Sequence, residues 1–89
     1  MKHDITAYLN YMDTETIAAL LKIYNLTYRH VAIRLNCTRP NISYHMKNDT
    51  FKPFEREMIL RLFLERGLEF AELVIINKLI TTSKKVNTL

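Results

Sequence analysis

The sequence predicts an all-α protein, a compact five-helix bundle organised around residues 27–47, which read as a helix, a sharp turn and a second helix. Apolar residues recur at helical spacing along most of the chain. Hydrophobic residues make up 48% of the 89 residues, with one glycine and two prolines, which suits a packed helical core and argues against disorder. A chain of this length forms one core, with little room for a deep substrate pocket. We therefore expect a single domain over residues 1–80.

The N-terminal part of the chain contains two helical patterns. Residues 4–12 read as a short helix that Asp4 can cap, with its apolar residues on one face. The helical spacing of these apolar residues does not continue beyond residue 12, so a new helix is expected within residues 13–25. Its inward face consists of Ile17, Leu20, Leu21 and Tyr24.

The first helix of the central pair is predicted from its ends and its apolar face. Thr27 is a good N-cap residue. The inward face consists of Val31, Ala32 and Leu35. Asn36 ends this helix, because asparagine tolerates a left-handed backbone better than any residue except glycine.

The second helix of the pair begins directly after the turn. Cys37 is small and apolar enough to be buried in the corner, and Thr38 or Arg39 caps the helix. Pro40 lies in the first turn, where its missing N–H group costs little. The inward face consists of Ile42 and Met46.

The segment TYRHVAIRLNCTRPNISYHMK, residues 27–47, resembles the helix-turn-helix of the Cro and phage-repressor (Xre-like) DNA-binding family. Ala32 lies where the family has a small residue at the crossing of the two helices. Asn36 replaces the usual turn glycine, and residues 38–43 are close to the common opening of a recognition helix. A looser resemblance extends over residues 14–72.

The resemblance implies a small transcriptional regulator, a bacterial or phage repressor, that binds double-stranded DNA sequence-specifically and reads the major groove with the helix at 39–48. The residues that would contact bases are Thr38, Arg39, Asn41, Ser43 and Tyr44. The residues that would contact phosphates are Tyr28, Arg29, Lys47 and Lys52. The alternative for all of them is an ordinary exposed helix surface.

The net charge of +4 is concentrated in this segment. Residues 27–53 hold five basic residues against Asp49 alone, whereas residues 54–72 hold three arginines against five glutamates. A phosphate-facing surface requires such an excess of positive charge. A solvated basic surface without a ligand explains the charge equally well.

The chain then predicts one more amphipathic helix and an apolar segment. Pro53 opens a helix that ends at Arg66, with Gly67 in the position of a helix-terminating glycine. If residues 68–80 form a helix, almost every side of that helix is apolar. For residues 74–82, a helix is favoured over a strand.

A helix that is apolar all round must be covered all round, so residues 68–80 are expected to contact a partner. The expected partner is a second copy of the chain, and a regulatory protein is the alternative. The residues that would form the dimer interface are Leu68, Ile75, Ile76 and Leu79. Residues 81–89 are expected to be a frayed polar tail.

Enzymatic activity and cofactors are not expected. Ser43 has no base placed near it, and the sequence has no glycine-rich phosphate loop. Carboxylates are expected to face solvent with arginine partners, in the pairs Glu57–Arg61 and Arg61–Glu65. The histidines and the lone cysteine lack the spacing of a metal site. These residues are His3, His30, His45 and Cys37.

Neither a membrane span nor a signal peptide is supported, so a cytoplasmic, nucleoid-associated protein is expected. A single cysteine cannot form an internal disulfide. The alternative function is that of a protein-interaction module, antirepressor-like or antitoxin-like, which keeps the helix-turn-helix fold and acts through residues 68–80.

Overall fold

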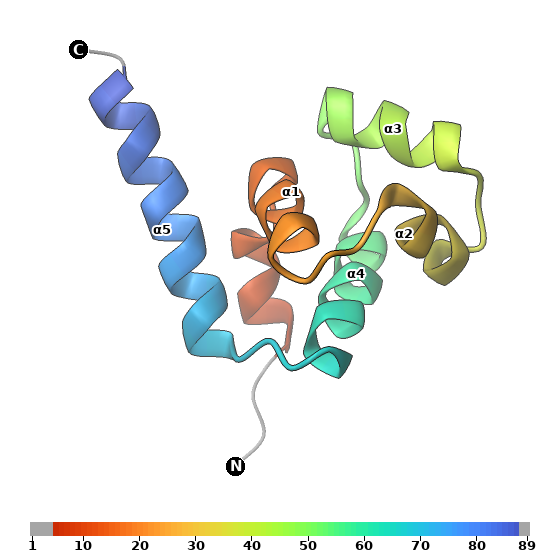
Figure 1. Cartoon of the computed structure of the whole chain (residues 1–89), viewed down its shortest axis with the longest axis horizontal. Helices are drawn as coiled ribbons and strands as arrows, with labels where there is room; N and C mark the ends of the chain where they lie inside the picture. Colours follow the sequence, from red (N-terminus) through yellow and green to blue (C-terminus); the bar gives the residue numbers. More distant parts are fainter. Residues whose placement is uncertain (1–4, 88–89) are drawn as a thin grey trace.

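The computed structural model describes the backbone of residues 5–87 and the side chains of residues 5–83. This part of the chain contains helices and no strand, which confirms the all-α prediction and excludes the strand alternative for residues 74–82. The helices are η1 (Ile5–Tyr11, a 3-10 helix), α1 (Thr14–Ile23), α2 (Tyr28–Leu35), α3 (Arg39–Asn48), α4 (Pro53–Glu65) and α5 (Phe70–Asn87) (Figure 1).

The described residues form six helices, one more than the predicted total of five. The short helix expected over residues 4–12 is present as the 3-10 helix η1. Extended backbone at Asp13 (φ −75°, ψ 169°) separates this segment from α1. The Asp13 carboxylate then caps α1, since its Oδ1 accepts a hydrogen bond from the backbone N–H of Thr16 at 2.8 Å. The predicted cap of the first segment, Asp4, lies outside the described residues.

The prediction of a frayed tail was wrong for residues 81–87, which continue α5 to Asn87. No proline or glycine follows Gly67, so no residue interrupts the helical backbone. The hydroxyl of Thr81 also donates a hydrogen bond to the carbonyl of Asn77 at 3.0 Å, within the helix.

Helices α1 to α4 all end in the same way. The first or second residue after each helix has a positive φ, and the N–H of the residue that follows it donates to the carbonyl five positions earlier, which satisfies a carbonyl that the helix leaves unpaired. The residues with positive φ are Asn25 (55°), Asn36 (55°), Asp49 (54°) and Gly67 (105°). The hydrogen bonds are Leu26 to Leu21 (2.8 Å), Cys37 to Ala32 (2.9 Å), Thr50 to His45 (3.2 Å) and Leu68 to Phe63 (3.0 Å). The predictions for Asn36 and Gly67 are confirmed.

This chain reversal corrects the prediction for Leu68, which is only 4% exposed and belongs to the core. The positive φ of Gly67 turns the chain back, and the N–H of Leu68 then pairs with the carbonyl of Phe63. An apolar residue at this position of the motif commonly packs on the end of the helix that it terminates. Leu68 is therefore not available for a dimer interface.

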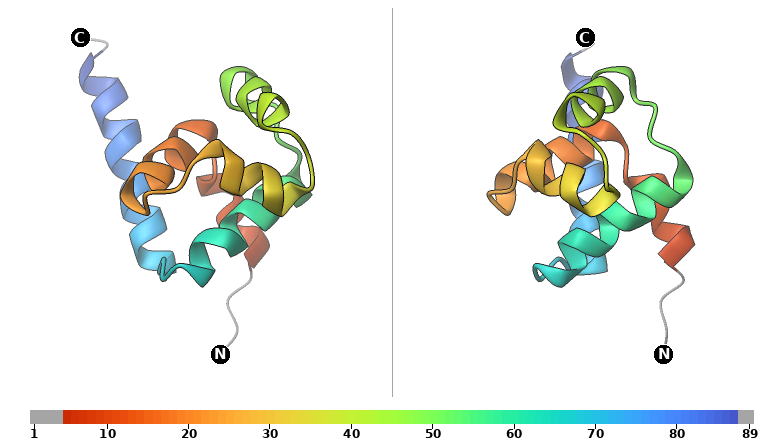
Figure 2. Two further views of the ribbon diagram at one scale, coloured as in Figure 1. Left: turned by 45° about the vertical axis from the view of Figure 1, so that its right-hand side comes forward. Right: turned by 90° about the vertical axis from the view of Figure 1, so that its right-hand side faces the viewer.

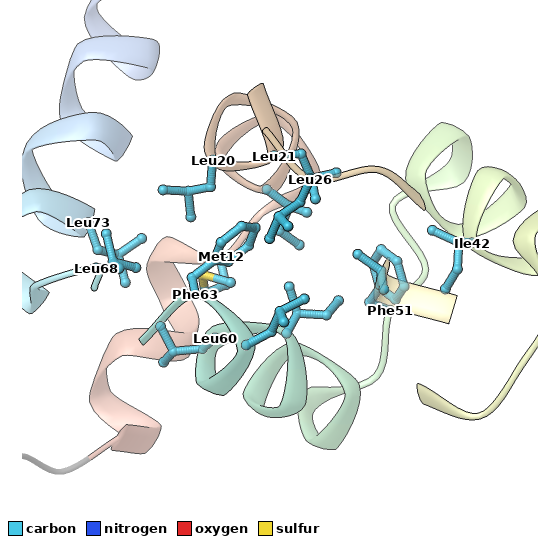
Figure 3. Packing of buried hydrophobic residues seen from close by; sticks show 14 of the residues in the cluster. Met12, Leu20, Leu21, Leu26, Ile42, Phe51, Leu60, Phe63, Leu68 and Leu73 are labelled. Atoms are coloured by element: carbon cyan, nitrogen blue, oxygen red, sulfur yellow. The ribbon is translucent and has the colours of Figure 1, made fainter. Parts of the chain in front are cut away.

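The core lies between η1, α1, α4 and the first turns of α5 (Figure 3). The fully buried side chains include Met12, Ile17, Leu20, Ile59, Leu60, Phe63 and Leu73. Helices α2 and α3 join the same core through the predicted residues Val31, Ala32 and Ile42. The remaining predicted inward residues, Tyr24, Leu35 and Met46, are half-buried against it.

The α2–α3 pair and α5 lie at opposite ends of the molecule (Figures 1 and 2). Helix α5 packs on α1 and η1 through its first half, where the rings of Tyr8 and Phe70 lie 4.2 Å apart. The amide of Asn77 donates to the hydroxyl of the buried Thr16 at 3.1 Å and to the carbonyl of Tyr11 at 3.3 Å. The second half of α5 extends beyond the other helices (Figure 2). No helix in the described residues has the length and apolar character that crossing a membrane requires.

Candidate nucleic-acid interface

Helix α3 presents one face to the core and the other to solvent. Ile42 is fully buried, whereas the predicted base-contacting residues all lie on exposed positions. These residues are Thr38, Arg39, Asn41, Ser43 and Tyr44. The hydroxyl oxygen of Thr38 caps α3 by accepting a hydrogen bond from the backbone N–H of Asn41 at 3.3 Å.

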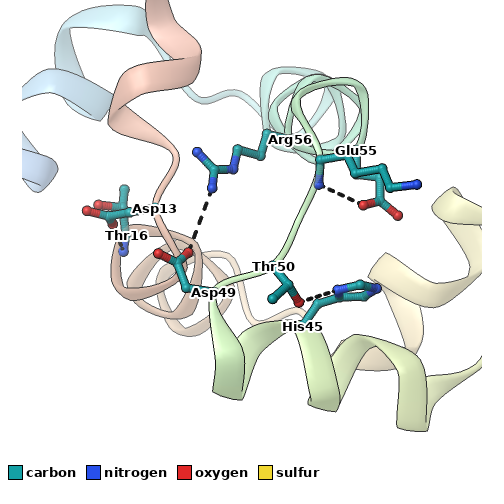
Figure 4. Close-up of polar contacts among 8 residues, drawn as sticks. Asp13, Thr16, His45, Asp49, Thr50, Glu55 and Arg56 are labelled. Atoms are coloured by element: carbon teal, nitrogen blue, oxygen red, sulfur yellow. Dashed lines mark hydrogen bonds and ion pairs between the residues drawn. The ribbon is translucent and has the colours of Figure 1, made fainter.

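The far end of α3 is tied to α4 through the connection between them. The Nδ1 atom of His45 and the hydroxyl of Thr50 lie 2.6 Å apart, and a carboxylate oxygen of Asp49 lies 3.8 Å from the Arg56 guanidinium (Figure 4). Phe51 is 4% exposed, and its ring lies 5.1 Å from the imidazole of His45. Phe51 was not among the predicted core residues, because it stands in a connection outside any periodic segment.

Helix α2 is fixed at both ends. The backbone N–H of Thr27 donates to Nδ1 of His30 at 3.0 Å, which confirms Thr27 as the start of this helix. The guanidinium of Arg34 donates two hydrogen bonds to the carboxylate of Glu65 on α4, one of them at 3.0 Å. The hydrogen bonds from Arg34 lower the pKa of Glu65 below its ordinary value.

The Arg34–Glu65 pair corrects one of the predicted ion pairs. Glu57 and Arg61 pair as predicted, at 3.0 Å. Glu65, predicted to pair with Arg61, pairs with Arg34 instead, because the crossing of α2 over α4 brings a guanidinium from outside the helix into reach. Arg34 is therefore occupied within the protein and does not add to a free basic surface.

The face formed by α1, α2 and α3 is hollowed in three places around Tyr28. One hollow, of about 340 Å³, is lined by Tyr28, Arg39, Pro40 and Ser43. A second, of about 280 Å³, has Tyr28, Ser43 and Lys47 among its lining residues. The structure thus brings two predicted base-contacting residues, Arg39 and Ser43, next to two predicted phosphate-contacting residues, Tyr28 and Lys47.

The cations among the predicted contact residues are exposed and make no ion pair within the described part of the chain. They are Arg29, Arg39, Lys47 and Lys52. By contrast, Arg34, Arg56 and Arg61 each contact a carboxylate. Unpaired cations on an exposed surface leave a positive potential that favours an anionic ligand.

No protein-family model, curated protein or solved structure matches this chain. A functional assignment therefore rests on the arrangement and charge of its own residues.

The remaining predicted contact residues lie outside the hollows around Tyr28. Asn41 and Tyr44 are exposed on α3, and the ring of Tyr44 stands edge-on to that of His45 at 5.7 Å. Arg29 is exposed in the first turn of α2. Lys52 is the N-cap residue of α4, and its backbone N–H donates to the carboxylate of Glu55 at 2.8 Å.

Lys22 was not among the predicted contact residues, although it lines the third hollow near Tyr28 and Arg39. Lys22 lies in the last turn of α1, one helix before the predicted motif. No spacing in the sequence relates this position to α3, because their proximity depends on how the chain turns at Asn25.

Cys37 is half-buried where a buried side chain was predicted. Burial, with the negative charge of Glu55 as a smaller effect, raises the pKa of the Cys37 thiol. A raised pKa lowers the fraction of reactive thiolate at neutral pH.

The four residues predicted to form a dimer interface divide into two groups. Leu68 is buried and Ile76 is half-buried against the core. Ile75 and Leu79 are 57% and 63% exposed, one helical turn apart on α5. The exposed apolar surface of α5 is therefore smaller than predicted.

Proposed function

We propose that this protein is a sequence-specific double-stranded DNA-binding protein of the helix-turn-helix type, related to the Cro and phage-repressor family, and that it acts as a small transcriptional regulator. The observation that carries the proposal is the surface around α3. There an exposed helix face adjoins cations that have no partner within the described residues.

In this proposal α3 enters the major groove, with α2 above it against the DNA backbone. Arg39, in the first turn of α3, can donate two hydrogen bonds to O6 and N7 of a guanine. Ser43 and Tyr44, further along the same exposed face, can reach base edges, thymine methyl groups or phosphates.

The supporting contacts would come from the cations and from Tyr28. Arg29, Lys47 and Lys52 are exposed, and each can neutralise a phosphate. Contacts of this kind supply affinity for any DNA sequence, whereas the α3 residues select among sequences.

The proposal includes pairing of two protomers through α5. One helix reads only a few base pairs, too few to select one operator among the competing sites of a genome. Ile75 and Leu79 offer the exposed apolar surface for this pairing. Burying these two side chains contributes at most about 3–6 kcal/mol before the costs of association, so the dimer is expected to be weak in the absence of DNA.

Selection of bound sequences from a pool of random duplexes tests the proposal. We expect enrichment of a short motif, and of two such motifs about one turn of DNA apart if α5 pairs the protomers. Recovery of the starting pool without enrichment, despite binding, would contradict sequence-specific recognition.

One observation favours a second candidate, a protein-interaction module that acts through α5. The second half of this helix projects from the body of the molecule and carries the exposed Leu79 (Figure 2). This candidate predicts binding to another protein and no binding to duplex DNA at low salt, the opposite of the result expected above.

A further inference from the structure

The three hollows around Tyr28 are parts of one groove. Tyr28 lines all three, Ser43 lines the first two, and Arg39 lines the one of 340 Å³ and the third, of about 310 Å³. Ala18 of α1 lines both the second hollow, of about 280 Å³, and the third. We call this continuous depression the Tyr28 groove.

Residues of α1 and of α3 line the Tyr28 groove at both of its ends. At one end Glu15 of α1 and Lys47 of α3 line the same hollow. At the other end Lys22 of α1 and Arg39 of α3 line the same hollow.

The two ends differ in charge. Lys22 and Arg39 bring two cations to one end, and neither is ion-paired among the described residues. At the other end the lining residues include one cation, Lys47, and a carboxylate, Glu15. An anion is therefore held more strongly at the Lys22–Arg39 end.

The floor of the groove suits a sugar-phosphate backbone better than a free ion. Tyr28 packs on the core, and the hollow at the Lys22 end also contains Leu21 and Leu26. Such a floor can contact a deoxyribose while Lys22 and Lys47, at the two ends of the groove, contact phosphates.

We propose that the Tyr28 groove holds the backbone of one DNA strand and that Lys22 is a phosphate-binding residue. This inference rests on the proposed function and extends it, because it adds α1 to the contact surface and gives the strand a path between α1 and α3. Glu15 then marks the end of the groove where the strand is held less tightly.

The test compares salt dependence of binding for two matched lysine variants on a random-sequence duplex pool. Lys22→Gln should make the slope of log K against log salt less steep by about 0.9, the effect of one lost phosphate contact, and should weaken binding to all sequences alike. Lys78→Gln removes the same charge from an exposed position on α5, at the other end of the molecule, and should leave the slope unchanged.

Two further variants separate a lost contact from a damaged fold. Lys22→Arg keeps the charge and should keep the slope of the unmodified protein. Glu15→Gln should tighten binding, because it removes the negative charge from the groove. If Lys22→Gln and Lys78→Gln behave alike while the unmodified protein binds DNA, the path through the Tyr28 groove is wrong. If the unmodified protein itself shows no salt-dependent binding, the proposed function has failed, and this inference with it.

Discussion

Tyr28, in the first turn of α2, and Ser43, in the middle of α3, line the same two hollows. Tyr28 belongs to the helix that supports α3, whereas Ser43 lies on the exposed face of α3 itself. Tyr28 also packs on the core, so it connects the buried interior to the candidate DNA surface. Tyr28 therefore links the core, which holds α2 in place, to the hollows beside the exposed face of α3.

Arg39→Ala tests the reading of bases. We expect this change to relax the base preference at one position of the bound sequence, at a cost of about 1–3 kcal/mol for the preferred base. The melting temperature should hardly change, because Arg39 is exposed and makes no ion pair among the described residues. Selection from random duplexes and thermal unfolding provide the two measurements. Unfolding of Arg39→Ala would show that α3 is wrongly oriented in this account.

Asn36→Gly tests the way in which α2 ends. Asn36 has a φ of 55°, where an asparagine is strained and a glycine is not, so the change should be neutral or should stabilise the protein by up to about 1 kcal/mol. Asn41→Gly is the matched control, since Asn41 lies within α3 and its replacement should destabilise by about 0.5–1 kcal/mol. Chemical denaturation measures both. A clear loss of stability in Asn36→Gly would reveal a role for the asparagine side chain.

Much of this architecture was predictable because it depends on local signals. The αL conformation of Asn36 and the positive φ of Gly67 follow from residue types next to the end of an apolar pattern. The same ending at Asn25 and Asp49 was not identified, although asparagine and aspartate tolerate this conformation too.

Features that depend on contacts between distant segments were not predictable from spacing. Leu68 enters the core because the chain reverses at Gly67, and Phe51, in the connection between α3 and α4, is buried in the same core. Lys22 reaches the candidate interface only through the turn after α1. The predicted exposed residues of α3 are exposed because a single buried residue, Ile42, sets the rotation of that helix.

The Arg34–Glu65 pair predicts a pH dependence of stability. Glu65 has a pKa lowered below its ordinary value of 4.5, through hydrogen bonds from Arg34. The ionised carboxylate therefore stabilises the folded state at pH values above 4.5, and this contribution is lost as the pH falls through the lowered pKa of the folded state. Glu65→Gln should be less stable than the unmodified protein at neutral pH, and the difference should shrink in acid. A difference that stays constant between neutral and acidic pH would contradict the assigned ion pair.

Replacement of both Ile75 and Leu79 by glutamate tests the pairing through α5. We expect a folded protein that stays monomeric and binds a two-half-site operator much more weakly, because these side chains are exposed and their charge would oppose burial between two copies. Ile33→Glu is the control for sedimentation, since Ile33 is 70% exposed on α2 and should not affect association. Equal association of the unmodified protein and the double variant would leave α5 without a role in dimerisation.

The central claim is that the surface around α3 binds DNA through its phosphates, and the salt dependence of binding tests it most directly. If about four phosphates are neutralised per protomer, log K against log salt should have a slope of about −3 to −4 for each half-site. Lys47→Ala should make that slope less steep by about one and weaken binding to all sequences alike. Absence of binding at low salt, or binding that does not change with salt, would contradict the claim.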